Sequence, residues 1–281
     1  MLREEILALM EALRLRGMQA VYDEVLSNGR KQKAIPEKVL LEFLKAEAAE
    51  RKLRSIRYRL GQARFPIMKD LDSFRFDQPG IDEAQIRSLY EGAFLQEHSN
   101  LIFVGGTGTG KTHLAIAIAY RAIQNGFDAL FCTAAALIDT LSEAASCGKL
   151  RERLHDYVSP DVLVIDEVGY LSYGPDAANV LFHVVNERHQ KKRAMLFTTN
   201  KSTDEWGNVL HDHDLADVIV DRILERGRTL KLDGPSYRTK HLGLDGQPQA
   251  GVSTKPARIS GIQPAEFPEP THPIVVITCF S

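Results

Sequence analysis

Residues Gly105–Ala119 read GGTGTGKTHLAIAIA and directly follow the apolar run LIFV at Leu101–Val104. The apolar run predicts a buried strand, the glycines predict a tight turn, and the apolar spacing after Lys111 predicts a helix. Within this stretch, Gly105–Thr112 matches the pattern GxxxxGK[ST] in the strand, turn and helix context that the pattern requires. The stretch therefore predicts a P-loop that binds the phosphates of a nucleotide, because such a turn directs backbone N–H groups at phosphate oxygens.

The residues of this turn have separate expected roles. Lys111 is expected to reach the β- and γ-phosphates, and Thr112 is expected to hold Mg²⁺ through its hydroxyl. A flexible glycine loop without a ligand would not need a Lys-Thr pair at this place. The backbone expected to surround the phosphates comprises Gly105, Gly106, Thr107, Gly108, Thr109 and Gly110.

A second motif follows the apolar segment Asp161–Ile165, which predicts a buried strand ending at Asp166 and Glu167. Ligands of open α/β sheets collect at the carboxyl ends of the strands. Asp166 is expected to bind Mg²⁺ through water, and Glu167 is expected to polarise an attacking water. An acidic strand end is ordinary when it stands alone, but beside a P-loop the pair favours hydrolysis over transfer to another acceptor.

Three further polar residues are candidates for the same site. The segment Met195–Asn200 predicts a strand, and Asn200 at its end is placed to orient the attacking water. Arg222 lies on the helical run Leu215–Glu225, and Arg238 follows the sequence GPSY. An arginine presented to the γ-phosphate of a neighbouring subunit would stabilise transition-state charge, whereas a surface salt bridge is the alternative for either arginine.

Strand-like and helical segments alternate through the second part of the chain, which predicts an α/β fold with a parallel sheet between helices. One helix is expected to start near Lys111 and to end at Asn125-Gly126. Another is expected to start near Pro175 with Glu187, Arg188 and Lys191 facing outward. The expected strands are Leu101–Val104, Ala129–Thr133, Val162–Ile165, Met195–Thr199 and Thr229–Leu232.

The chain divides into four expected regions. Residues 1–64 carry apolar residues at helical spacing and predict a small helical N-terminal domain, with breaks at Ser27–Gly29 and at Pro36. Residues 65–80 predict a linker, and residues 81–244 predict the nucleotide-binding domain. Half of the chain's 12 prolines fall in residues 245–281, which predicts a disordered tail.

Composition sets limits on the location and the partners. The net charge is −2 with 26% charged residues, so any nucleic-acid surface must be local. The 3 cysteines form no CxxC pair, which favours a reducing compartment, and no apolar run approaches the roughly 20 residues of a membrane span. We expect a cytoplasmic protein that does not engage a membrane.

Several motifs together resemble the IstB-like AAA+ ATPases, the helper proteins of insertion-sequence transposases, which are related to the DnaC helicase loaders. The resemblance covers roughly Leu9–Arg238. It rests on GTGTGKTHLA at Gly106–Ala115, VLVIDEVGYL at Val162–Leu171, TTN and EWG within Thr198–Gly207, VDRIL at Val220–Leu224 and GPSYR at Gly234–Arg238. It implies that Lys111 and Thr112 are the Walker A residues and that Asp166 and Glu167 are the Walker B residues. It also implies that Asn200 is the sensor 1 residue, that Arg222 is the arginine finger and that Arg238 is a sensor 2-type arginine.

The resemblance also implies an activity and partners. A member of this family would be an ATPase that uses ATP and Mg²⁺ and converts ATP and water to ADP and phosphate. It would form a homo-oligomer with ATP at the subunit interfaces, bind duplex target DNA and activate its cognate transposase. A DnaC-like replicative helicase loader shares the same nucleotide machinery. A P-loop small-molecule kinase and a nucleotide-gated interaction protein with negligible turnover are alternatives from other classes.

Two basic clusters are candidates for the DNA surface. No acidic residue interrupts the run from Arg51 to Lys69, and its apolar residues are spaced so that they can pack inward while the arginines face phosphates. A solvated basic helix is the alternative. The candidate DNA-binding residues are Arg51, Lys52, Arg54, Arg57 and Arg59 in this run, with Lys149 and Arg151 beside the nucleotide-binding core.

Overall fold

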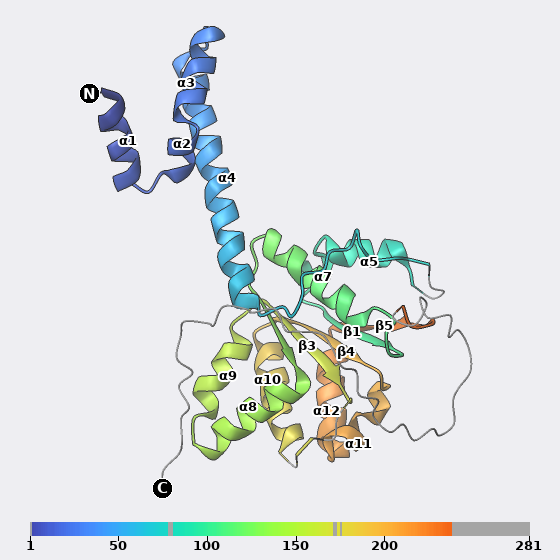
Figure 1. Ribbon diagram of the computed structural model, residues 1–281. Helices are drawn as coiled ribbons and strands as arrows, with labels where there is room; N and C mark the ends of the chain where they lie inside the picture. Colours follow the sequence, from blue (N-terminus) through green and yellow to red (C-terminus); the bar gives the residue numbers. More distant parts are fainter. Residues whose placement is uncertain (1, 78–80, 171–172, 175, 238–281) are drawn as a thin grey trace, which may run out of the picture.

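The computed structural model describes residues 2–77, 81–170, 173–174 and 176–237. A helical N-terminal module stands on a long helix, α4 (Pro36–Ala63), above an α/β domain (Figure 1). The predicted tail and Arg238 lie outside the described residues. Within the residues described, no helix combines the length and apolar character needed to cross a membrane.

The α/β domain is built on a parallel sheet with the strand order β2-β3-β4-β1-β5, which confirms the predicted fold class. The carboxyl ends of all its strands lie at one edge because every pair is parallel. The chain after β1 and the chain after β3 therefore meet at that edge, where ligands of such sheets bind. The strands are β1 (Asn100–Gly105), β2 (Ala129–Thr133), β3 (Val162–Val168), β4 (Ala194–Thr199) and β5 (Gly227–Leu232).

Helices cover both faces of the sheet (Figure 1). Leu101 and Phe103 of β1 pack with α5, α6 and α7 on one face, while Ile102 between them packs on the other face. The first face carries α5 (Glu83–Tyr90), α6 (Ala93–Gln96) and α7 (Lys111–Gln124). The second face carries α8 (Ala134–Ser146), α9 (Leu150–Val158), α10 (Ala177–Gln190), α11 (Trp206–Leu210) and α12 (His213–Leu224), with the short 3₁₀ helix η1 (Thr203–Glu205) before α11.

The expectation that Arg188 faces outward is wrong, because its side chain is fully buried under the last turn of α10. Its guanidinium donates hydrogen bonds to carbonyl oxygens of the turn that enters β3 and of the first residue of β4. Burial lowers the pKa of Arg188 to about 9, so the group stays charged near neutral pH. The accepting carbonyls belong to Tyr157, Val158, Pro160, Asp161 and Ala194.

The N-terminal module consists of α1 (Leu2–Ala12), α2 (Arg16–Ala20), α3 (Tyr22–Lys31) and the outer part of α4. Its buried apolar core is small and contains Met18, Tyr22 and Phe43. The buried carboxylate of Glu47 on α4 accepts hydrogen bonds from the backbone N–H groups of Gly17 and Met18 at 2.8 and 3.3 Å. These bonds fix the start of α2 against α4.

The predicted break at Ser27–Gly29 is wrong, because α3 runs through these residues. Gly29 allows α3 to pack closely on α4, because a Cβ atom at this position would lie 2.9 Å from Cγ2 of Val39 on α4. Pro36 does mark a boundary, since it occupies the first turn of α4, where its missing N–H costs no hydrogen bond.

Residues 65–77, most of the predicted linker, pack onto the α/β domain. Leu71 and Phe74 are buried in the same core as α7, and so is Ala63 at the end of α4. The last turn of α4 and the segment that follows it therefore form part of the wall of the domain.

Candidate nucleotide-binding site

The P-loop lies between β1 and α7, as the sequence predicts. Gly108 and Gly110 have φ values of 79° and 94°, which is left-handed backbone that side chains with a Cβ rarely adopt. The ammonium group of Lys111 donates hydrogen bonds to the carbonyl oxygens of Gly105 and Gly106 at 3.0 and 2.7 Å. The loop is thus closed around its lysine, with the N-terminus of the 14-residue helix α7 directed at the same space.

Thr112 and Asp166 come together although 54 residues separate them. The hydroxyl of Thr112 donates a hydrogen bond of 2.8 Å to Oδ1 of Asp166, and the Asp166 side chain is buried. A hydroxyl oxygen beside a carboxylate oxygen is a donor set that suits Mg²⁺, which prefers hard oxygen ligands and retains several waters. These two residues fit the predicted metal site.

Glu167 lies at an irregular point of β3. The register between β3 and β4 shifts between Ile165 and Val168, and Glu167 has a φ of 62°. Its exposed side chain lines a cavity beside the P-loop. A left-handed glutamate is uncommon and costs roughly 1–2 kcal/mol, and such conformations concentrate at functional sites.

At the end of β4, the residue that contacts the acidic pair is Thr198. Its buried hydroxyl donates to Oδ1 of Asp166 at 2.5 Å and accepts from the Glu167 N–H at 3.0 Å. Asn200 is exposed in the bend after β4 and, within the part of the chain that is described, does not line the cavity. The sequence did carry a signal for Thr198, namely a polar residue inside the apolar strand Ala194–Thr199.

A cavity of about 480 Å³ connects these groups, within the size range of ligand pockets. The P-loop, Glu167 and Thr198 form one wall. The opposite wall comes from the segment 66–75. Phe74 of that segment touches the P-loop, because a Cβ atom on Gly110 would lie 2.6 Å from its ring.

His113 on α7 joins the two walls. Its Nε2 lies 2.8 Å from the carbonyl oxygen of Asp70, and its ring packs edge-on against Phe74 with the centroids 5.3 Å apart. Burial lowers the pKa of His113, which favours the neutral imidazole. The histidine therefore serves as packing between α7 and the segment 66–75.

Tyr237 brings the segment after β5 onto the P-loop. Its N–H donates to the carbonyl oxygen of Gly108 at 3.0 Å, and its hydroxyl lies 2.5 Å from the Arg75 carbonyl and 2.6 Å from Oδ1 of Asp77. Burial and the neighbouring Asp77 raise the pKa of Tyr237. The sequence drew attention to Arg238 in this motif, but the described contacts belong to the tyrosine before it.

Arg222 does not line the cavity of its own chain, as far as the described residues go. Its guanidinium bonds to the amide oxygen of Asn186 and lies 5.0 Å from the ring centroid of Phe182, both on α10. The structure therefore places it on the α10–α12 side of the domain. Its role as a finger toward another subunit stays a prediction.

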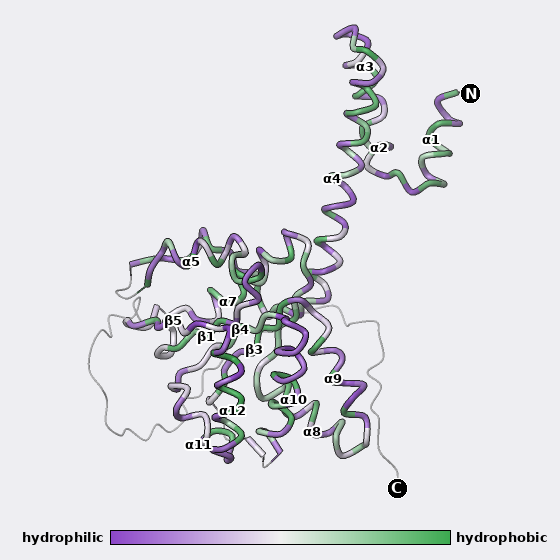
Figure 2. The backbone as a smooth tube through the Cα atoms, turned by 180° about the vertical axis from the view of Figure 1, so that it is seen from behind, coloured by the Kyte–Doolittle hydropathy of each residue, from purple (hydrophilic) through white to green (hydrophobic). Residues whose placement is uncertain are grey.

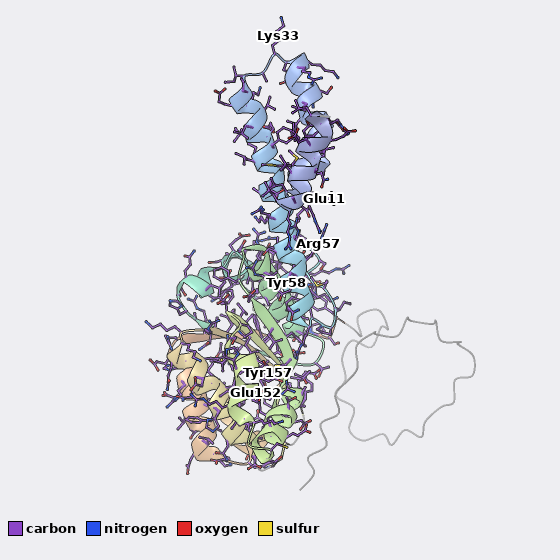
Figure 3. The ribbon with its side chains drawn as sticks, turned by 90° about the vertical axis from the view of Figure 1, so that its left-hand side faces the viewer. Glu11, Lys33, Arg57, Tyr58, Glu152 and Tyr157 are labelled. Atoms are coloured by element: carbon purple, nitrogen blue, oxygen red, sulfur yellow. The ribbon has the colours of Figure 1, made fainter. Side chains whose placement is uncertain are left out.

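The candidate DNA-binding residues on α4 differ in their surroundings. Arg51, Arg54 and Arg59 form ion pairs with carboxylates, whereas Lys52 and Arg57 are exposed and have no ion pair among the residues described. Figure 3 shows Arg57 and Tyr58 on the lower part of α4, just above the α/β domain. Lys149 and Arg151 are exposed at the start of α9.

The sheet order, the P-loop after β1 and the acidic end of β3 define an ATP-binding P-loop protein of the AAA+ type. The DnaC helicase loader shares this fold, with a TM-score of 0.50 and 23% identity over 58% of this chain and 96% of that chain. A family model described as IstB-like ATP binding protein matches residues 8–244. The chain belongs to the family of IstB-like ATP-binding proteins.

Named relatives come from insertion sequences. The putative ATP-binding protein of insertion sequence IS5376 from Geobacillus stearothermophilus is 39% identical over 211 residues, which are 75% of this chain and 84% of the relative. The corresponding protein of IS21 from Pseudomonas aeruginosa is 35% identical over 252 residues, or 89% of this chain and 93% of the relative.

Proposed function

We propose that the protein is an ATPase that assembles on duplex DNA as the helper of an insertion-sequence transposase. The observation that carries the ATPase proposal is the convergence of Thr112, Asp166 and Glu167 at the mouth of the P-loop. The membership in a family of insertion-sequence ATP-binding proteins supports the link to transposition.

In this proposal the residues of the site divide the work of hydrolysis. The P-loop amides and Lys111 bind the phosphates, and Thr112 and Asp166 hold Mg²⁺. The metal ion supplies positive charge at the phosphate oxygens. Glu167 accepts a proton from the water that attacks the γ-phosphorus, and the bond to the β-phosphate oxygen breaks to leave ADP. Asn200 orients that water if its bend moves toward the cavity.

Assembly would complete the site. We propose a homo-oligomer with ATP at its subunit interfaces, where Arg222 of a neighbouring subunit stabilises the transition-state charge. The sensor 2-type role of Arg238 also belongs to this proposal, because Tyr237 before it already contacts the P-loop.

The proposed DNA surface is the exposed side of α4, together with Lys149 and Arg151. Lys52 and Arg57 are its strongest members, because no carboxylate neutralises them among the described residues. Contacts to phosphates by such side chains give binding that depends on salt and not on sequence.

The first experiment measures ATP hydrolysis and sedimentation with and without duplex DNA, beside the variant Lys111→Ala. We expect ATP-dependent assembly on duplex DNA in the wild-type protein and neither assembly nor hydrolysis in the variant. If the protein hydrolyses ATP but neither binds duplex DNA nor assembles on it, the DNA proposal is refuted. That result would favour a helicase loader, which can be tested with a replicative helicase.

The DNA surface has its own test. The slope of log K against log salt should fall in magnitude by about one for each of Lys52→Ala and Arg57→Ala, because each removes one phosphate contact. Arg87→Ala on α5 removes the same charge elsewhere and should leave the slope unchanged. If all three variants keep the slope of the wild-type protein, α4 is excluded as the DNA surface.

A further inference from the structure

We propose that Thr198 is a positioning residue that sets both acidic groups of the site at once. Its hydroxyl would hold the carboxylate of Asp166 toward Thr112 and fix the backbone of Glu167. This inference rests on the proposed function, in which Asp166 holds Mg²⁺ and Glu167 activates water.

The first argument comes from the direction of side chains along a strand. Successive residues of a regular strand point to opposite faces of the sheet, so Asp166 and Glu167 could not serve one site from regular backbone. Asp166 instead bonds to Thr112 while Glu167 lines the same cavity. The local irregularity of β3 is what brings the two adjacent carboxylates to one place.

The register locates that irregularity opposite Thr198. Ile165 pairs with Phe197 and Val168 pairs with Thr199, so two residues of β3 face the single residue Thr198 of β4. This two-against-one arrangement is a β-bulge, a device that redirects side chains near active sites.

The hydroxyl of Thr198 makes two hydrogen bonds to the residues of the bulge. It donates to the Asp166 carboxylate and accepts from the N–H of Glu167, and the side chain is 1% exposed. On the other side of the bulge, the carbonyl oxygen of Glu167 accepts from the Tyr173 hydroxyl at 3.3 Å and from the Tyr170 N–H at 3.4 Å. The left-handed glutamate is thus held through both of its peptide groups.

Removing the hydroxyl alone should therefore disturb both acids without changing the P-loop. Thr198→Val keeps the shape of the side chain but leaves the Glu167 N–H without its partner, and the Asp166 carboxylate keeps the bond from Thr112 but loses the one from β4. Hydrogen-bond partners that orient metal ligands typically contribute about 10–100-fold to metal affinity or activity. We expect losses of that size in kcat and in Mg²⁺-dependent affinity.

The experiment measures two quantities in the full chain. The first is the affinity for a fluorescent methylanthraniloyl-ATP in Mg²⁺ and in EDTA, and the second is kcat and KM for ATP. Thr198→Val should lose the Mg²⁺-dependent part of the affinity and about 10–100-fold in kcat, with the EDTA affinity unchanged. Thr198→Ser, which keeps the hydroxyl, should recover most of both.

The matched control is Thr133→Val. Thr133 ends the strand on the other side of β3 and pairs in register with Asp166, but its hydroxyl caps α8 by accepting from the Ala136 N–H. Wild-type behaviour of Thr198→Val, or an equal loss of Mg²⁺ dependence in Thr133→Val, would overturn the proposal.

Two further outcomes are informative. If circular dichroism shows that Thr198→Val does not fold, Thr198→Ala and Thr198→Ser provide the same comparison, because they differ only in the hydroxyl. If the wild-type protein binds Mg²⁺ and nucleotide without turnover, the proposed ATPase function fails. The Mg²⁺-dependent affinity alone then decides whether Thr198 positions the site.

Discussion

The α/β domain and the N-terminal module differ in how completely they bury their apolar residues. Strands β1, β3 and β4 of the domain are covered on both faces by helices. The core of the module has three buried apolar residues, and Figure 2 shows hydrophilic and hydrophobic residues mixed along α4. Large apolar side chains exposed on the module include Leu2, Leu9, Leu13, Leu40, Leu41 and Leu44.

This difference explains where a chemical site can be built. Groups such as Thr198 and Asp166 stay within hydrogen-bonding distance because packed strands fix their backbones. The module instead depends on a few specific contacts, above all those of Glu47 with Gly17 and Met18. We therefore expect its helices to open locally at a lower free energy than the sheet does.

The largest effect is expected at the candidate site of the α/β domain. Glu167→Gln should lower the rate of ATP hydrolysis by about 10²–10⁴-fold while nucleotide binding remains, because the amide cannot accept the proton of the attacking water. Single-turnover hydrolysis and nucleotide titration separate the two effects. Glu152→Gln on the exposed side of α9 is the control, and a similar loss there would contradict a specific role for Glu167.

The next effect concerns the stability of the domain. Arg188→Met should lower the free energy of unfolding by about 3 kcal/mol or more, because several buried carbonyls lose their donor. Urea denaturation followed by circular dichroism measures this change. Lys191→Met at the exposed end of the same helix should change the free energy of unfolding by less than about 0.5 kcal/mol. Equal stabilities of the two variants would show that the arginine is replaceable.

Much of the candidate nucleotide-binding site could be predicted from the sequence because phosphate binding requires fixed residue types at fixed spacing. The glycines before Lys111 and the acids after an apolar strand are local patterns, and parallel strands bring such ends together. These patterns identified Thr112 and Asp166, which the structure joins by a hydrogen bond.

The rest depends on geometry that no local pattern encodes. Thr198 contacts the acids because the register of β3 and β4 shifts, whereas the sequence pointed to Asn200. Arg188 was expected on the outer face. It is buried because it bonds to a turn 27–31 residues earlier, a contact that the local pattern of α10 does not show. Tyr237 reaches the site through contacts with Gly108 and Asp77, which are more than a hundred residues away along the chain.

A pair of glycine substitutions, one on α2 and one near the end of α4, sharpens the contrast. A Cβ atom at Gly17 would lie 2.5 Å from the carbonyl oxygen of Ala46, whereas one at Gly61 would meet nothing within 4 Å. Gly17→Ala should therefore destabilise the packing of α2 on α4 by about 1–3 kcal/mol. Gly61→Ala should stabilise α4 by up to about 1 kcal/mol, because alanine favours a helix interior. Hydrogen exchange of α1–α4 measures both, and effects of the same sign would contradict this account of the packing.

The smallest effect is a dependence of the stability of the module on pH. The ion pair with Arg51 and the N–H groups of Gly17 and Met18 hold the pKa of Glu47 below its usual value of 4.5. A carboxyl whose pKa is lowered by folding stabilises the folded state above its unfolded pKa, and this contribution is lost as the pH falls through the folded pKa. Amide exchange in α2 should therefore accelerate as the pH falls below about 4.5, after correction for the intrinsic rate. Glu47→Gln should exchange faster already at neutral pH and lose this acid dependence, whereas Glu37→Gln in the first turn of α4 should behave like the wild type. An acid dependence that survives in Glu47→Gln would assign the titration to another carboxyl and leave the attachment of α2 to apolar packing alone.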